Sequence, residues 1–248
     1  MGILNVTPDS FADGGRHNEF EAAVARGIEM IAEGVDIIDV GGESTRPGAE
    51  RVSEEEEIAR TIPVIRELAK HGATISIDTM RASTAEAAIK AGAAIINDVS
   101  GGLADDAMLQ TAARLKVPYI AMHWRGQSKD MNSKAIYGDV VNDVIAELNE
   151  RIDAALDAGI QKDKLIIDPG IGFAKDAEHN WAIIDAIDRF IELGYPVLVV
   201  ASRKRFLGGD TPDEREQATI DLTKRLGTTG VWAVRVHSVK PHKEVLSS

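Results

Sequence analysis

Two carboxylates and one amide could together hold a planar heterocycle. Asp78, Asn97 and Asp168 each follow directly on a short apolar run, and the run Leu165–Ile167 suits a strand that is buried on both faces. A charge at the end of such a strand is costly without a partner. Each residue taken alone could cap the next turn, but the recurrence of the pattern favours one shared site with acceptors and donors for amide-like and amino edges.

Side chains suited to phosphate or carboxylate follow two other apolar runs. Lys204 comes shortly after Pro196–Val200, and Arg235 and His237 alternate within the last apolar run. Alternate residues of a strand point to the same side, and arginine can hold two phosphate oxygens at once. We therefore expect these three side chains to meet an anion. His123 follows a further apolar run and fits a framework histidine as well as a catalytic one.

The composition narrows the function classes. The chain has 248 residues with 28 basic and 40 acidic side chains, a formal net charge of −12, which argues against a nucleic-acid groove or an anionic membrane surface as partner. It has no cysteine, which excludes disulfides, thiolate chemistry and cysteine-ligated metals. No apolar run reaches membrane-spanning length and no signal peptide is visible, so we expect a cytoplasmic protein without membrane or nucleic-acid partners.

Eight apolar runs alternate with helical patterns, which predicts parallel strands covered by helices. This favours a single α/β domain of residues 1–248, folded as a (β/α)8 TIM barrel with all strand ends at one mouth. An open doubly wound sheet is the alternative, but a glycine-rich dinucleotide loop after the first strand is missing. We expect strands at 1–4, 35–40, 74–77, 94–96, 117–122, 165–167, 196–200 and 231–236, helices near 18–34, 137–158 and 179–193, and another helix capped by Ser53 and Glu56.

Seven segments of the chain, in one order, resemble the dihydropteroate synthase family. The match covers nearly the whole chain. One motif such as Asp-Pro-Gly would be a weak signal, but seven in series are specific. The segments His123-Trp-Arg125 and 203–208 look most like actinobacterial members. The seven segments are 1–11 (MGILNVTPDSF), 39–48 (DVGGESTRPG), 76–79 (SIDT), 97–101 (NDVSG), 168–173 (DPGIGF), 202–204 (SRK) and 235–237 (RVH).

The resemblance implies an enzyme, a transferase of folate biosynthesis that condenses 6-hydroxymethyl-7,8-dihydropterin diphosphate with 4-aminobenzoate to give 7,8-dihydropteroate and diphosphate. It also implies Mg²⁺ as cofactor, a homodimer packed through the later helices, and a site that sulfonamides occupy. Compared with the family, the lead-in before the first strand and the C-terminal helix look shortened.

The resemblance also assigns roles position by position. It assigns the pterin to Asp78, Asn97, Asp168 and Lys204, the diphosphate to Thr45, Arg46, Arg235 and His237, the 4-aminobenzoate to Pro47, Phe173, Ser202 and Arg205, and the metal to Asn5, with Asp78, Asp168, Lys204, Arg235 and His237 as the catalytic groups.

The chemistry of this reaction suits these residue types. Departure of the diphosphate is the hard step, because an aniline nitrogen needs no base and the electron-rich ring can delocalise positive charge at the methylene carbon. We therefore expect a dissociative substitution, in which carboxylates stabilise the cation and Arg235 and His237 stabilise the leaving group. Two alternatives stay open: a pterin-dependent methyltransferase, whose substrate carries no diphosphate, and a non-catalytic pterin-binding relative.

Two loops are predicted to move during the reaction. Thr7–Gly15 and Ser44–Gly48 are rich in glycine, serine and proline and would overhang the barrel mouth. We expect them to be mobile in the free protein and to close over the pterin diphosphate, so that 4-aminobenzoate binds second.

Overall fold

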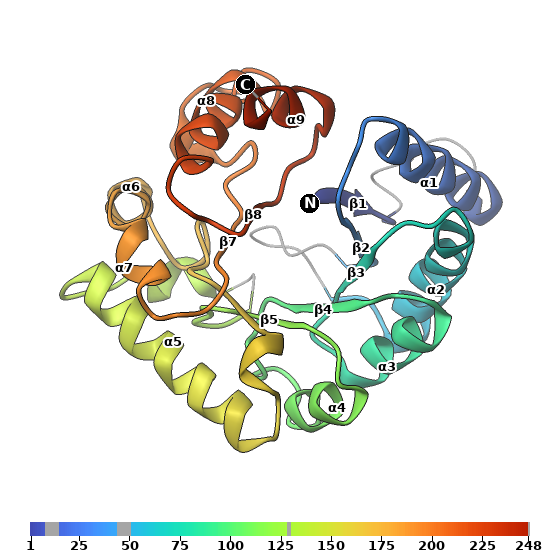
Figure 1. Cartoon of the computed structure of the whole chain (residues 1–248), viewed down its shortest axis with the longest axis horizontal. Coiled ribbons are helices and arrows are strands. Elements are labelled where there is room, and N and C mark those ends of the chain that lie inside the picture. The colour runs from blue at the N-terminus through green and yellow to red at the C-terminus, as the bar shows by residue number, and fades with distance from the viewer. Residues whose placement is uncertain (8–14, 44–50, 128–129, 248) are drawn as a thin grey trace.

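The computed structural model describes residues 1–7, 15–43, 51–127 and 130–247. Its strands surround the centre of the molecule, and the helices lie outside them (Figure 1). All neighbouring strands pair in parallel and follow one another in chain order, which confirms the predicted α/β barrel. The strands are β1 (Gly2–Asn5), β2 (Ile38–Gly41), β3 (Ile75–Asp78), β4 (Ile95–Asp98), β5 (Tyr119–Met122), β6 (Leu165–Asp168), β7 (Leu198–Val199) and β8 (Ala233–Val234).

Pairing around the barrel is uneven. Strands β1 to β6 form one continuous sheet, whereas β7 and β8 form a separate pair of two-residue strands. Single bridges close the ring, from Gly2 to Val236 on one side and from Ile167 to Val197 on the other. The predicted runs at 196–200 and 231–236 therefore contain much shorter strands than their apolar length indicates.

The helices cover the outer face of the barrel. Ser53 caps α2 as predicted, because its hydroxyl accepts a bond from the Glu56 amide at 3.2 Å. None of the helices within the described ranges is long and apolar enough to cross a bilayer. The helices are α1 (Gly15–Ala32), α2 (Glu54–Lys70), α3 (Ala82–Ala91), α4 (Met108–Leu115), α5 (Val140–Asp157), α6 (Ala177–Asp185), α7 (Ile187–Ile191), α8 (Glu216–Leu226) and α9 (Lys240–Leu246).

Three predicted helices differ from the structure. The helix expected from 18 already begins at Gly15. The helix expected from 137 begins only at Val140, because the Asp139 side chain accepts bonds from the amides of Val141 and Asn142 and so caps the helix there. The helix expected over 179–193 is in fact two helices, α6 and α7. Ala186 separates them, since its backbone (φ −103°, ψ 22°) leaves the helical region.

Alternation along the strands sorts the core into two parts. One set of strand residues, including Ile38 and Ile77, joins the large cluster that packs against the helices. The other set points into the barrel and forms a separate apolar layer there. That inner layer consists of Met1, Ile37, Ile95, Ile120, Ile166, Leu198 and Val200.

Candidate active site at the barrel mouth

Polar residues lie just beyond the inner apolar layer, toward the carboxyl ends of the strands. Asp39, Asn97 and Asp168 each stand two residues after an isoleucine of that layer, so their side chains also point into the barrel. Asp78 ends β3 at the same level, paired in register with Asn97. All four are buried. The strands therefore place a polar set directly above an apolar floor, at the carboxyl ends where barrel enzymes keep their chemistry.

Arg235 connects this polar set to the last strand. Its Nε donates to Asp39 Oδ2 at 2.5 Å and one of its terminal nitrogens donates to Asp78 Oδ2 at 2.7 Å. Asn97 also donates to Asp39 Oδ2, at 3.1 Å. Burial raises the pKa of the Asp78 carboxyl, and the Arg235 guanidinium opposes that rise. Two carboxylates thus share one cation.

Asp39 is the member of this cluster that the sequence analysis did not assign. It is completely buried, and its Oδ1 has no hydrogen-bond partner among the described residues. The signal was present, because an aspartate in the middle of the apolar run 35–40 needs a charged partner. That partner, Arg235, lies 196 residues away in the chain.

Asp168 at the end of β6 and Lys204 after β7 attract each other at this mouth, and Lys204 also contacts Phe173. Asp168 Oδ1 accepts a bond from the Gly170 amide at 2.7 Å, and burial raises the pKa of Asp168 to about 6. Lys204 donates to the Ile171 carbonyl and lies 4.5 Å from the centre of the Phe173 ring. Burial lowers the pKa of Lys204 to about 8, against the effect of Asp168.

A glycine makes room for Lys204. A Cβ at Gly172 would lie 2.6 Å from the Cδ of Lys204, and the backbone there has φ +77°. Only glycine combines that conformation with the close approach, so the Asp-Pro-Gly-Ile-Gly segment is shaped around the lysine.

Ser202 and His237 form a pair beside this cluster. The two side chains are joined by a bond of 2.9 Å between Ser202 Oγ and His237 Nδ1, and the His237 amide donates to the same Oγ at 3.2 Å. Ser202, which the resemblance assigns to 4-aminobenzoate, thus holds His237 in this structure. Arg205 is exposed at the start of a short 3₁₀ turn, Arg205–Leu207.

His123 is engaged on both ring nitrogens. Its Nε2 lies 2.9 Å from Glu147, and its Nδ1 lies 2.9 Å from the Lys175 amine. The side chain is almost fully buried, and burial lowers the pKa of His123 to about 4. Of the two interpretations from the sequence, these contacts favour the framework histidine.

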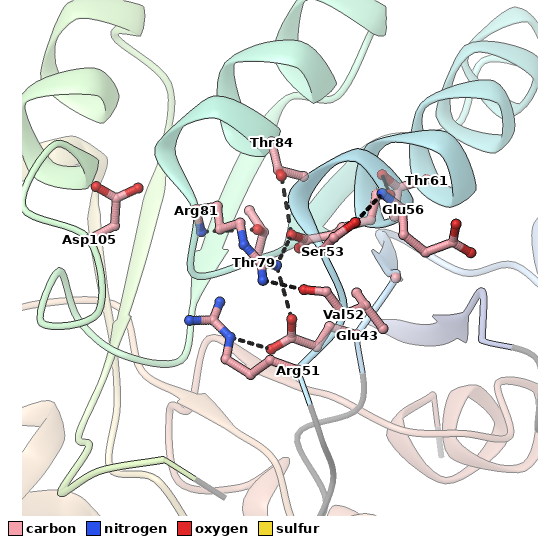
Figure 2. Close-up of polar contacts among 12 residues, drawn as sticks. Glu43, Arg51, Val52, Ser53, Glu56, Thr61, Thr79, Arg81, Thr84 and Asp105 are labelled. Carbon is pink, nitrogen blue, oxygen red and sulfur yellow. Dashed lines mark hydrogen bonds and ion pairs between the residues drawn. The ribbon is translucent and has the colours of Figure 1, made fainter.

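Thr45, Arg46 and Pro47 lie outside the described residues, as do most of the two loops predicted to close. The flanks of segment 44–50 are described, and Arg81 joins them (Figure 2). Its guanidinium donates to Glu43 at 2.9 Å on one flank and to the Val52 carbonyl at 2.5 Å on the other.

Arg81 was not among the site residues expected from the sequence. It follows Asp78 by three residues and also pairs with the buried Glu57 at 2.5 Å, while Arg51 donates to Glu43 at 2.9 Å (Figure 2). A lone arginine at a helix start carries no sequence signal for such a role.

Asn5 ends β1 at the same mouth. It pairs in register with Gly41, and a Cβ on Gly41 would lie 3.8 Å from Asn5 Oδ1 and 3.7 Å from Asp78 Oδ2. Within the described ranges no group of three or more His, Cys, Asp or Glu side chains could hold a metal ion. An amide oxygen is nevertheless a ligand type that Mg²⁺ accepts, and this ion commonly takes one or two protein ligands together with substrate phosphates.

The matching family model, a similar sequence and similar solved structures all indicate one enzyme family. The family model described as "Pterin binding enzyme" matches residues 1–237. The dihydropteroate synthase of Mycobacterium leprae is 47% identical over 256 residues, which cover 99% of this chain and 90% of the relative. A solved dihydropteroate synthase of Xanthomonas albilineans with 4-aminobenzoic acid has a TM-score of 0.93 and 44% identity, covering 100% of this chain and 90% of that one.

A second structure of the Xanthomonas albilineans enzyme holds 7,8-dihydropteroate. It has a TM-score of 0.90 and 40% identity, and it covers 100% of this chain and 90% of that one.

Proposed function

Because the chain belongs to the pterin-binding enzymes, we propose that its barrel mouth carries out the dihydropteroate synthase reaction by a dissociative substitution. The enzyme is a transferase of folate biosynthesis that joins 6-hydroxymethyl-7,8-dihydropterin diphosphate to 4-aminobenzoate and releases diphosphate. One observation carries the mechanism. Two buried carboxylates, Asp39 and Asp78, accept from the cation Arg235 at one mouth, and Asn97 donates to Asp39 beside them.

The pterin binds to the acceptor side. Asp78, Asn97 and Asp168 offer two carboxylates and one amide to the amino and amide edges of the ring, and Lys204 donates to a ring or carbonyl acceptor. The pterin takes the place of Arg235 at Asp78, and Arg235 keeps its bond from Nε to Asp39. Its terminal nitrogens then turn to the diphosphate, which they can hold with two donors.

The diphosphate leaves before the new bond is complete. The methylene carbon–oxygen bond breaks, its electron pair leaves with the diphosphate, and Arg235 and His237 stabilise the anion. Asp78 and Asp168 stabilise the cation on the methylene carbon and ring. The aniline nitrogen then forms the carbon–nitrogen bond and releases its proton to solvent, so a general base is secondary. Thr45 and Arg46 are assigned to the diphosphate by the resemblance.

Asn5 is our candidate ligand for Mg²⁺. Its amide oxygen lies at the mouth, across Gly41 from the Asp78 carboxylate. When bound, Mg²⁺ would neutralise charge on the diphosphate.

The aminobenzoate binds at the outer side of the mouth. Phe173 supplies an aromatic surface beside Lys204, and the exposed Arg205 offers a guanidinium for the carboxylate. Pro47 and Ser202 complete the set that the resemblance assigns.

We also expect a cytoplasmic homodimer packed through the later helices. Trp181 on α6 is 38% exposed, and its ring packs edge-on against Phe206 with centroids 5.4 Å apart. An exposed tryptophan supported by a second aromatic ring is typical of an interface. Light scattering of the wild type and of Trp181→Glu tests this: a dimer that becomes a monomer supports it, and a wild-type monomer contradicts it.

Incubation with the pterin diphosphate and 4-aminobenzoate, with and without Mg²⁺, tests the reaction. We expect 7,8-dihydropteroate and diphosphate in equal amounts, with faster formation when Mg²⁺ is present. A methyltransferase would leave the diphosphate uncleaved, and a non-catalytic relative would bind the pterin diphosphate in calorimetry without forming product. Either result would overturn the proposed activity.

A further inference from the structure

Lys175 is a cation that the proposed mechanism does not use. Its amine contacts the backbone of the turn that joins Asp168 to Phe173. The amine lies 3.0 Å from the Gly170 carbonyl, 3.0 Å from the Phe173 carbonyl and 2.9 Å from His123 Nδ1. The first two belong to the turn between Asp168 and Phe173. An ammonium group has three hydrogens to donate, and three acceptors surround this one.

The third acceptor, His123 Nδ1, has a lone pair available because of the hydrogen bond that the other ring nitrogen makes. A carboxylate only accepts hydrogen bonds, so His123 Nε2 carries the proton that it donates to Glu147 at 2.9 Å, and Nδ1 presents a lone pair to Lys175. Glu147 is in turn fixed by Arg125, whose Nε lies 3.0 Å and 3.1 Å from its two oxygens. The low pKa of His123 keeps this ring neutral at physiological pH.

The turn that Lys175 contacts also orients Asp168. The Phe173 amide donates to the Gly170 carbonyl at 3.0 Å and closes the turn, and the Gly170 amide donates to Asp168 Oδ1 at 2.7 Å. Gly170 has φ +71°, and a Cβ there would lie 2.5 Å from the His123 carbonyl. The turn is therefore seated tightly on the end of β5.

The backbone just before Lys175 is in an unfavourable conformation. Ala174 has φ +49°, in the left-handed region that residues other than glycine rarely adopt. Such conformations persist when the surrounding contacts impose them. Here the bend leads the chain so that the Lys175 amine reaches the carbonyls of Gly170 and Phe173.

We propose that Lys175, as an ammonium ion, is a positioning residue that holds the Gly170–Phe173 turn and thereby fixes the Asp168 carboxylate and the Phe173 ring for the reaction. The expected effect on catalysis rests on the proposed function. The hydrogen bonds from the Lys175 ammonium to its three acceptors do not depend on that function.

The proposal makes the turn sensitive to pH. Burial lowers the pKa of Lys175 to about 7, Asp168 and Glu147 raise it, and Lys204 and Arg125 lower it further. His123 and the ring of Tyr137, 6.0 Å from the amine, also face this group. As pH rises through about 7 in the free enzyme, Lys175 loses a proton and one of its three donors. The turn then loosens, so activity declines on the alkaline side.

The test compares Lys175→Met, which has no donor, with Lys175→Gln, whose amide keeps two N–H donors and does not titrate. Lys162→Met is the matched control, because Lys162 precedes β6 while Lys175 follows it, and Lys162 also lies near a ring, that of Tyr195. We expect Lys175→Met to lower kcat/KM for the pterin diphosphate roughly 10–100-fold, as small misplacements of catalytic groups do.

Lys175→Gln should fall between Lys175→Met and the wild type, and Lys162→Met should equal the wild type. The alkaline decline of kcat/KM should be smaller in Lys175→Gln than in the wild type, although Lys204 still titrates in both. A purely structural lysine would change the unfolding temperature but not this pH profile. A Lys175→Met enzyme within twofold of the wild type, with an unchanged profile, would overturn the proposal.

Nitrogen NMR of the wild type decides the matter if Lys175→Met does not fold. We expect the Lys175 amine to titrate near neutrality and His123 to keep its proton on Nε2. A His123 ring that carries its proton on Nδ1 overturns the proposal, because that nitrogen could not accept a hydrogen bond from Lys175. An amine that titrates near the ordinary lysine value of 10.5 contradicts the predicted pH dependence. This measurement needs no turnover, so its failure is distinct from failure of the proposed reaction, which shows as a wild-type enzyme without product.

Discussion

The six-stranded part of the barrel and the two-stranded part supply opposite charges. Strands β1 to β6 are four residues long and almost wholly buried, and near their ends they carry the carboxylates Asp78 and Asp168 and the amide Asn97. Strands β7 and β8 are two residues long, β8 is only half-buried, and the cations Lys204, Arg235 and the side chain of His237 follow them.

This difference fits what each substrate part requires. A pterin ring is rigid and keeps its shape through the reaction, so fixed acceptors on long paired strands can recognise it. A diphosphate moves away as its bond breaks, and cations on short strands and loops can follow it. Arg235 joins the two parts, because it leaves β8 and contacts residues of β2 and β3.

The largest expected effect is on the acceptor side, from Asp168→Asn. An amide keeps one acceptor oxygen and no charge, so both ring recognition and stabilisation of the cation suffer. We expect kcat/KM to fall on the order of 10²–10³-fold, as for the loss of one preorganised electrostatic group. Far-ultraviolet circular dichroism should show an unchanged fold. Asp163→Asn, on the exposed turn before β6, is the control and should keep full activity.

On the cation side, Arg235→Ala should separate the two parts of the substrate. We expect affinity for the pterin diphosphate to fall roughly 10–100-fold, because hydrogen bonds to a charged group contribute about 1.5–3 kcal/mol. Affinity for 6-hydroxymethyl-dihydropterin without diphosphate should change much less. Calorimetry with both ligands measures this.

Arg235→Lys serves as the companion variant. It keeps a charge near Asp39 and Asp78 but loses the two-pronged donor. If Arg235→Ala and Arg235→Lys weaken both ligands equally, the division between acceptor and cation sides is wrong.

The acceptor side should also set the acid limb of activity. The pKa of Asp168 is raised from the ordinary 3.8 to about 6, so this carboxyl is protonated in the free enzyme below about pH 6. We expect kcat/KM for the pterin diphosphate to fall up to tenfold per unit of pH below that value. A pH profile that stays flat from pH 7 to 5 would show that Asp168 need not be ionised.

The same shift has a stability consequence of defined sign. Because the folded-state pKa is raised, Asp168 contributes stability that is present below about pH 4 and is lost as pH rises through about 6. Asp168→Asn should remove that slope. Urea midpoints of both proteins between pH 4 and 7 compare it directly, and parallel curves would exclude this contribution.

The smallest expected effect comes from Ser202→Ala, which tests how the short strands hold their cations. Loss of the bond to His237 should lower kcat about fivefold, since one hydrogen bond contributes about 1 kcal/mol. The KM for 4-aminobenzoate should stay the same. If that KM rises while kcat is kept, Ser202 serves the aminobenzoate, as the family resemblance indicates, rather than His237.

The sequence predicts the long strands and their ends better than the contacts between them. Period-two alternation places Asp78, Asn97 and Asp168 at one mouth, and the structure agrees. The same reasoning could not find that Arg235 pairs with Asp39 and Asp78, because 196 and 157 residues separate them in the chain.

The other differences concern the lengths of two strands and a break in one helix. The runs around Leu198 and Ala233 are apolar over five or six residues, but barrel closure pairs only two residues of each. The length and the apolar alternation of a run predict that it is buried. The number of residues that pair with another strand depends on which strands lie next to it, and the sequence does not show this. The break at Ala186 likewise follows a backbone conformation that alanine does not signal.

The apolar layer inside the barrel directs the electrostatic field of the site toward one end of the barrel. Ile37, Ile95, Ile120 and Ile166 form an insulating base beneath the charged groups, and charges on such a base interact through a low dielectric. Their field therefore spreads mainly through the open mouth, where an approaching anion meets Lys204 and Arg235 although the whole molecule carries a charge of −12. Under the proposed function, four isoleucines below the polar site would thus set the direction from which an anionic substrate is attracted.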